Sequence, residues 1–226
     1  MSSQRSSHTP GKHFFTLIFI ATAGLLLTAC ASSSPVVAQP SAAGLEQDFS
    51  GGTCPFGRMQ AGSSRGFECA DGEFRAWIDN NGEAYDFITA PLGERFTDVS
   101  IEVDARFVSG EDAGAYIVCR GSQLTGNFYY FRLGVDGAVE ITDYLEGEEQ
   151  IARMKLLPEI VIASGWNHLR ADCIGDTLSF YVNGELVLER TMEGDVYESG
   201  DIGLGAGGGS LGFSEVRFDN LAITKP

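Results

Sequence analysis

The residues best suited to chemistry lie in one short segment, which contains Glu102, Asp104 and Arg106. They alternate with apolar residues, so in an extended strand all three share one face. Two carboxylates about 5 Å apart can hydrolyse a glycosidic bond, one as nucleophile and one as acid. The apolar Phe107 follows in this segment and points to the other face. Solvation of a sheet face therefore explains these side chains better than hydrolysis does.

A single histidine, His168, is left once His8 and His13 are assigned to a cleaved leader. It could serve a Ser-His-Asp arrangement, but no Gly-x-Ser-x-Gly turn accompanies it. One imidazole also excludes a metal site built from several histidines. Residues 79–83, Asp-Asn-Asn-Gly-Glu, leave structural calcium open, although a simple turn accounts for them better. No other cofactor is expected.

Aromatic and guanidinium side chains recur on two neighbouring segments, as Tyr116 with Arg120 and Tyr130 with Arg132. We expect them on one exposed side, near the carboxylates described above. Such a face could bind a sugar, because aromatic rings stack on sugar rings and charged groups form hydrogen bonds with hydroxyls. The alternative is that the paired charges only keep this face of the sheet soluble. The candidate ligand-binding residues are Glu102, Asp104, Arg106, Tyr116, Arg120, Tyr130, Arg132 and His168.

Short segments with period-two alternation must position these residues. Ten or more such runs, separated by Gly, Asn and Asp, predict an all-β antiparallel sandwich of two sheets. Tight hairpins are expected at residues 135–138 and at Asn183-Gly184. The glycine-rich run 203–209 lacks the helix of a phosphate-binding loop, so we expect a flexible loop between strands there.

Four cysteines, besides Cys30, suit an exported protein with two disulfides, for which three pairings are open. We favour a local Cys54–Cys69 bond and a Cys119–Cys173 bond between two strands. The alternation points both Cys119 and Cys173 into the core, which supports the second pairing. No Cys-x-x-Cys spacing occurs, which argues against zinc.

The amino terminus predicts export. Arg5 and Lys12 precede an apolar run that is short for a membrane span and ends in Leu-Thr-Ala before Cys30. This end resembles the bacterial lipobox, which implies cleavage after residue 29 and lipid on Cys30. An ordinary secretory signal and a retained anchor are the alternatives. Ala31 in place of Asp implies, by resemblance to Gram-negative lipoproteins, an extracytoplasmic position on the outer membrane or cell surface.

The organisation that follows is a signal peptide over 1–29, a Ser/Ala/Pro-rich tether over 30–46 and one domain over 47–226. The chain carries 31 acidic and 15 basic residues, a net charge of −16. Such an acidic protein repels phosphates, so nucleic acid is not an expected partner.

The order of segments resembles a known family. Residues 165–170, 175–184, 200–204 and 218–221 are similar to the concanavalin A-like lectin/glucanase jelly roll. Within it, the laminin-G-like group and the bacterial 3-keto-disaccharide hydrolase domains match best, over residues 45–224. Retaining glucanases of this fold carry Glu-x-Asp-x-x-Glu, and here Phe107 replaces the last glutamate.

These features predict a surface-anchored lipoprotein whose domain binds a glycan or cell-wall saccharide without catalysis. The resemblance implies one alternative, a glycoside hydrolase acting on 3-keto-disaccharides or related sugars. A structural or adhesive protein-interaction module is the third.

Overall fold

The structure, a computed structural model, describes residues 44–61, 64–79, 81, 86–122, 124–145, 148–150, 153–193, 197–208 and 211–226. The predicted signal peptide, Cys30 and most of the tether lie outside them. Within the described residues, one 3₁₀ turn at Pro158–Ile160 is the only helical element, and no helix there could cross a membrane.

The described chain is otherwise built from strands. They are β1 (Leu45–Gln47), β2 (Met59–Ala61), β3 (Arg65–Ala70), β4 (Glu73–Ile78), β5 (Asp86–Pro91), β6 (Val99–Ser109), β7 (Gly114–Gly121), β8 (Phe128–Gly134), β9 (Ala138–Leu145), β10 (Glu148–Glu149), β11 (Arg153–Leu156), β12 (Asn167–Ile174), β13 (Thr177–Val182), β14 (Glu185–Thr191), β15 (Asp201–Gly208) and β16 (Ser214–Thr224).

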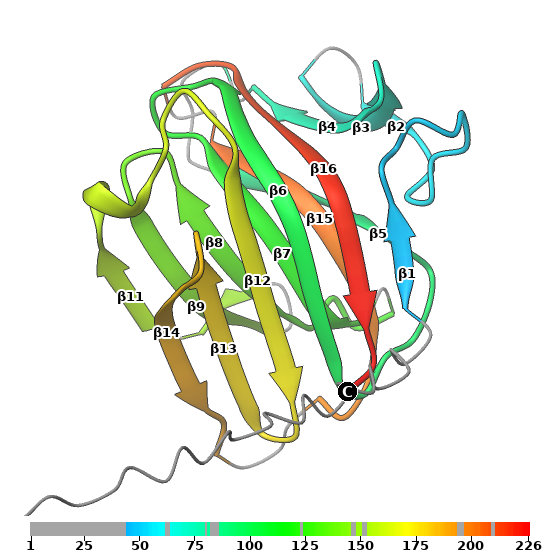
Figure 1. The fold of residues 1–226 in the computed structure, drawn as a ribbon, viewed down its shortest axis with the longest axis vertical. Coiled ribbons are helices and arrows are strands. Elements are labelled where there is room, and N and C mark those ends of the chain that lie inside the picture. The colour runs from blue at the N-terminus through cyan, green and yellow to red at the C-terminus, as the bar shows by residue number, and fades with distance from the viewer. Residues whose placement is uncertain are drawn as a thin grey trace, which may run out of the picture. The chain divides into compact units, whose positions relative to one another are not determined.

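Two antiparallel sheets pack face to face (Figure 1). The nine-stranded sheet has the order β14-β13-β12-β6-β16-β4-β3-β2, with β1 also paired to β16. The seven-stranded sheet has the order β10-β9-β8-β7-β15-β5, with β11 also paired to β9. The predicted two-sheet, all-β antiparallel sandwich is confirmed. Leu45 and Glu46, assigned above to the tether, already belong to strand β1.

The core lies between the sheets, and the sequence alternation selects its residues. Ile101 and Val103 of β6 face Ile117 of β7 and Phe131 of β8 in one buried cluster. Burying such side chains contributes about 1.5–3 kcal/mol each. The alternating polar residues of every strand therefore point away from the core, on the outer face of one sheet or the other.

Both predicted disulfides are present. Cys54 pairs with Cys69 of β3, and Cys119 of β7 pairs with Cys173 of β12. The second bond joins the two sheets through the core, because β7 and β12 belong to different sheets. Both of its cysteines are fully buried.

The two hairpins are also confirmed. Residues 135–137 connect β8 to β9, and Asn183-Gly184 connects β13 to β14. Asn183 and Gly184 both have positive φ, 52° and 85°, as the tightest hairpin turns require.

The expectation of a flexible loop at residues 203–209 is wrong. Residues 203–208 belong to β15, which lies inside the seven-stranded sheet between β7 and β5. Its intervening residues, Leu204 and Ala206, are buried in the core. The high glycine content suggested a loop because glycine contributes no side chain to packing. The residues that alternate with the glycines nevertheless bury one face of the strand.

Candidate functional site

The predicted ligand-binding residues do not lie on one face. Glu102, Asp104 and Arg106 are in β6 of the nine-stranded sheet, whereas Tyr116 and the other aromatic candidates are in the seven-stranded sheet. The prediction that the two groups are close is wrong. Alternation determines that a side chain points away from the core, but the outer faces of two packed sheets point in opposite directions.

The outer face of the seven-stranded sheet carries a cluster of aromatic rings, here termed the aromatic ridge. Its members come from β5, β7, β8 and β9, four strands of the sheet. They are Phe87, Tyr116, Phe128, Tyr130 and Tyr144. The sequence analysis missed Phe87, Phe128 and Tyr144, although their cross-strand alternation could have identified them.

Two rings of the ridge are covered by the others. Tyr116 and Tyr130 are each only 1% exposed, which corrects their predicted exposure. The Phe87 ring stacks on Tyr116, with centroids 5.1 Å apart and planes inclined by 10°. The Phe128 and Tyr144 rings stack on each other at 4.8 Å. Phe87, Phe128 and Tyr144 are half-buried, so these three rings offer the ridge's surface to a ligand.

Glycines make a low floor beside the ridge. Gly203 of β15 pairs with Val118 of β7 and Pro91 of β5, and Gly205 pairs with Tyr116 and Thr89. Because these glycines alternate with core residues, they face outward and add no side chain to the sheet surface. The surface is therefore lower along β15 than along β7 and β8.

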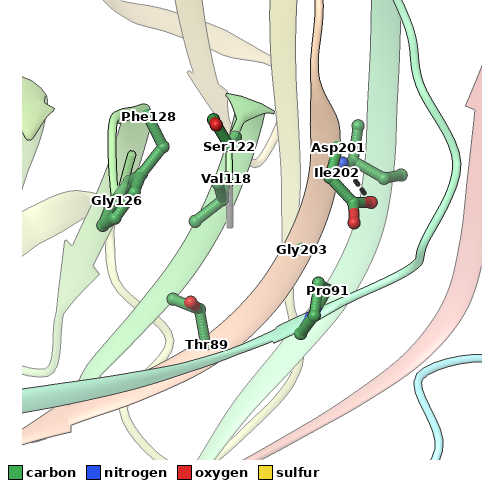
Figure 2. Close-up of a pocket in the computed structure, with 10 residues that line it drawn as sticks. Thr89, Pro91, Val118, Ser122, Gly126, Phe128, Asp201, Ile202 and Gly203 are labelled. Atoms are coloured by element: carbon green, nitrogen blue, oxygen red, sulfur yellow. Dashed lines mark hydrogen bonds between the residues drawn. The ribbon is translucent and has the colours of Figure 1, made fainter. Parts of the chain in front are cut away.

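A first hollow of about 200 Å³ lies over this floor (Figure 2). Thr89 and Pro91 border it on β5, Val118 and Phe128 border it on β7 and β8, and Asp201 stands at the start of β15. The Asp201 carboxylate accepts hydrogen bonds from the backbone N–H of Gly93, at 2.9 Å from both oxygens. This hollow is mainly apolar, with one fixed carboxylate at its end.

A second hollow, of about 210 Å³, is polar. It is lined by Tyr116, Tyr130, Arg132, Glu140 and Glu149. The Tyr130 hydroxyl lies 3.1 Å from a Glu140 oxygen and 2.9 Å from a Glu149 oxygen. An Arg132 nitrogen lies 4.0 Å from Glu140. The structure thus brings three predicted residues together with two glutamates that sequence analysis missed.

The phenol of Tyr130 stays protonated near neutral pH. Burial raises its pKa first, and the negative charge of Glu140 raises it further. The hydroxyl therefore acts as a neutral donor between two carboxylates. Glu140 could have been anticipated, because it is the direct cross-strand neighbour of Arg132 in the predicted hairpin.

Arg120 does not reach either hollow. It is 2% exposed, and its guanidinium donates to the carbonyls of Thr97 and Cys173 and pairs with Asp98. Alternation predicted an outward side chain, but a bulge between β7 and β15 shifts the register here. Arg120 adopts a positive φ of 52°, so alternation no longer determines its direction.

A separate cluster lies on the outer face of the nine-stranded sheet. The His168 Nδ1 atom is 2.9 Å from Asp104, and its Nε2 atom is 3.4 Å from Glu102. The Asn220 side-chain amide donates to the other Asp104 oxygen at 2.9 Å. The imidazole is 48% exposed, so an external molecule can reach it. Sequence analysis missed Asn220, which has a positive φ at a bulge in β16.

Arg106 of this face is held by its neighbours. Its guanidinium donates to both oxygens of Glu73 at 2.9 and 2.8 Å and lies over the Trp166 ring at 5.1 Å. Arg217 binds Glu73 as well, at 3.1 Å. These pairs form a charge network across the sheet, which agrees with the simpler interpretation of Arg106 as a solvating residue.

Within the described ranges, no three His, Cys, Asp or Glu side chains are arranged to hold a metal ion. Three residues of the predicted calcium turn, at 80, 82 and 83, lie outside those ranges. Structural calcium therefore stays a prediction.

Comparison with known proteins identifies the fold. The carbohydrate-binding module CBM66 of Bacillus subtilis is 19% identical, with a TM-score of 0.54, over 67% of this chain and 86% of its own. The Bacillus licheniformis β-glucanase is 12% identical, with a TM-score of 0.60, over 83% of this chain and 100% of its own. The laminarinase catalytic domain of Thermotoga maritima is 14% identical, with a TM-score of 0.58, over 80% and 97%. These similarities confirm the predicted concanavalin A-like jelly roll.

No curated protein sequence matches the chain. The family described as the 3-keto-alpha-glucoside-1,2-lyase-like domain matches residues 53–224. This match includes β2 to β16, and thus both sheets and both hollows. The chain belongs to the 3-keto-alpha-glucoside-1,2-lyase-like domain family.

Proposed function

We propose that this domain binds carbohydrate on the outer face of the seven-stranded sheet. The observation that supports the proposal most is the aromatic ridge, whose rings border two hollows on one sheet face. Half-buried rings can stack on the C–H faces of sugars. Arg132, Glu140 and Glu149 beside them can bond to hydroxyls in the second hollow. Solved structures named for carbohydrate binding and for glucanase activity share this fold, which agrees with a glycan ligand.

Binding is tested by passing the detergent-solubilised full chain over an array of bacterial, plant and fungal polysaccharides. We expect retention by at least one neutral polysaccharide and loss of retention in Phe128→Ala. Phe213→Ala is the matched control, because Phe213 is an exposed phenylalanine outside the ridge. Equal retention of both variants would reject the ridge as the site, and no retention of the wild type would reject carbohydrate binding.

A second candidate function is elimination from sugars oxidised at C3, which the family name and the His168 cluster support. In a 3-keto-α-glucoside, the C3 carbonyl acidifies the proton at C2. His168 Nε2 could remove that proton while Asp104 holds Nδ1. The C1=C2 double bond then forms as the C1–O bond breaks, and the leaving oxygen takes a proton from solvent.

The elimination is tested with a chromogenic 3-keto-α-glucoside. We expect release of the chromophore by the wild type and at least a hundredfold loss in His168→Ala and Asp104→Asn. Glu149→Gln separates the two faces, because its side chain lies in the second hollow. Release that is unchanged by the first two variants and lost in Glu149→Gln would assign the chemistry to the other face.

We also propose that lipid on Cys30 displays this domain outside the cytoplasm. The support is the lipobox-like end of the apolar run and the two disulfides, which persist in oxidising compartments. The test is labelling of growing cells with an alkyne-tagged palmitate. Labelling that is absent in Cys30→Ser supports the anchor, and labelling that persists in that variant rejects it.

A further inference from the structure

We infer that the site takes an extended stretch of a neutral oligosaccharide, at least three sugar units long, that lies over the ridge and reaches both hollows. This inference rests on the proposed carbohydrate binding and deepens it. The structural basis is a pair of small adjoining hollows on one sheet face, both bordered by aromatic rings of the ridge.

The two hollows adjoin, because Val118 of the first pairs with Tyr130 of the second, but together they are too long for one sugar. Phe128 borders the first hollow and Arg132 borders the second, and both belong to β8. Four residues along a strand span about 13 Å. Across the sheet, Thr89 of β5 and Glu140 of β9 are separated by four strand spacings, or about 19 Å. These lengths join the outer borders of the two hollows, so a single pyranose ring cannot fill both.

Each hollow is also small. Volumes of 200 and 210 Å³ lie below the roughly 300–1,000 Å³ of an ordinary ligand pocket. At about 30 Å³ per water molecule, each has room for some seven waters, which is comparable to one sugar ring. A ligand confined to one hollow would bury too little surface to bind well.

The ridge supplies the middle of the site. The rings of Phe87 and Tyr144 come from β5 and β9, near opposite edges of the sheet, yet their centroids are 5.6 Å apart. The Phe87 ring also contacts the buried Tyr130, at 5.7 Å between centroids. The half-buried rings thus form a continuous apolar surface beside both hollows, suited to stacking of a sugar unit.

The charges of the site favour a neutral chain. The second hollow contains two carboxylates, Glu140 and Glu149, and one cation, Arg132, which already lies beside Glu140. Among the described residues, the first hollow is lined by the Asp201 carboxylate and by no basic side chain. A uronic acid would place its charge near these carboxylates in a protein of net charge −16, which is repulsive.

The test is calorimetric titration of the full chain with laminari-, cello- and N-acetylchito-oligosaccharides of one to six units. For at least one series, we expect affinity to rise at least tenfold from the monosaccharide to the trisaccharide. Oligogalacturonates of the same lengths should bind at least tenfold more weakly. A monosaccharide that binds as tightly as the hexasaccharide, or oligogalacturonates that bind as tightly as the neutral series, would overturn the inference while carbohydrate binding stands.

Thr89→Trp fills the first hollow and leaves the second unchanged. We expect this variant to lose the increase in affinity that the added sugar units give, while it still binds the shorter sugars weakly. Thr191→Trp, at an exposed threonine of β14, is the matched control. Ser122→Tyr, at another border of the first hollow, repeats the test if Thr89→Trp unfolds. An equal loss of affinity for oligosaccharides of every length would overturn the extended site. If the wild type binds none of the sugars, the proposed function is rejected as well.

Discussion

The hydroxyl of Tyr130 has one proton for two carboxylate neighbours. Glu140 receives a further hydrogen bond from the Thr142 hydroxyl, 2.7 Å away, and lies near Arg132. Glu149 is on the short strand β10 and is exposed. Of the two glutamates, Glu149 is therefore the one whose carboxylate can turn to a ligand at the least cost in existing contacts.

Glu149→Gln should weaken binding of a neutral oligosaccharide by about tenfold, because hydrogen bonds to charged groups contribute about 1.5–3 kcal/mol. Calorimetric titration measures the change. Glu148→Gln makes the same charge change on the adjacent exposed residue, and we expect it to bind as the wild type does. Equal weakening in both variants would show a general charge effect rather than a contact in the second hollow.

Glu215 illustrates how the opposite face is held together. Burial acts to raise its pKa, but hydrogen bonds from Arg217 and Arg75 outweigh burial, so the pKa lies below its usual value. Arg75 and Arg217 each lie 2.8 Å from one of its oxygens. The carboxylate is thus stabilised in the folded state relative to the unfolded chain.

Glu215→Gln should lower the free energy of unfolding by about 1–3 kcal/mol at pH 7. A lowered folded-state pKa stabilises the fold above the unfolded pKa, about 4.3, and this stabilisation is lost as pH falls through the folded value. Urea unfolding from pH 7 to pH 3 should therefore show a difference that shrinks below about pH 4. A difference independent of pH would contradict this account.

At the scale of elements, β15 needs glycine for its approach to β5. A Cβ atom on Gly205 would collide with the carbonyl oxygen of Ile88. The strands could not keep their present pairing with a larger residue there. Gly203 of the same strand lines the first hollow, so the glycines of β15 serve both the strand packing and the site.

Gly205→Ala should therefore lower the free energy of unfolding by about 1–3 kcal/mol, the usual cost of overpacking. Gly51→Ala is the control, because a Cβ atom there meets nothing within 4 Å. Urea unfolding measures both. Equal stability of the two variants would show that β5 and β15 can separate at little cost.

The two disulfides close loops of different lengths. Cys119–Cys173 spans 54 residues and Cys54–Cys69 spans 15. In the chain-entropy model, removing the first by double alanine substitution should cost about 4 kcal/mol and removing the second about 3 kcal/mol. Alanine at positions 119 and 173 also leaves cavities in the core, because Cys119 and Cys173 are fully buried. These cavities add to the loss of stability in that variant. Urea unfolding that ranks the variants in the reverse order would contradict the assignment.

At the scale of the whole molecule, two chemically different surfaces lie on opposite sides of one core. The seven-stranded sheet presents rings and hollows, and the nine-stranded sheet presents His168 and a network of ion pairs. Strands of the two sheets contact one another through apolar core side chains. Among the residues that the structure describes, those named on one surface take no part in the other.

Effects on the two faces should therefore be additive. The unfolding free-energy changes of Glu149→Gln and His168→Ala should sum in the double variant to within about 0.5 kcal/mol, as for sites without shared partners. Binding of neutral oligosaccharide should be unchanged in His168→Ala alone. A coupling free energy between the two substitutions above about 1 kcal/mol would show that a change on one face affects the other face through the core.

The sequence by itself determined the two-sheet architecture, the turns and the disulfide pairing. Period-two alternation decides which side of a strand is buried, and this pattern is local. Asn183-Gly184 supplies a turn by its own backbone preference. Cys119 and Cys173 followed because both lie at core positions of their strands.

Only the tertiary structure decided which outward residues meet. Strands β6 and β7 are consecutive but belong to different sheets, so Asp104 and Tyr116 face opposite ways. A bulge redirected Arg120, and Phe87 reached Tyr116 across a strand of glycines. Contacts of this kind depend on strand order and register, which are set by long-range pairing and are invisible in a local pattern.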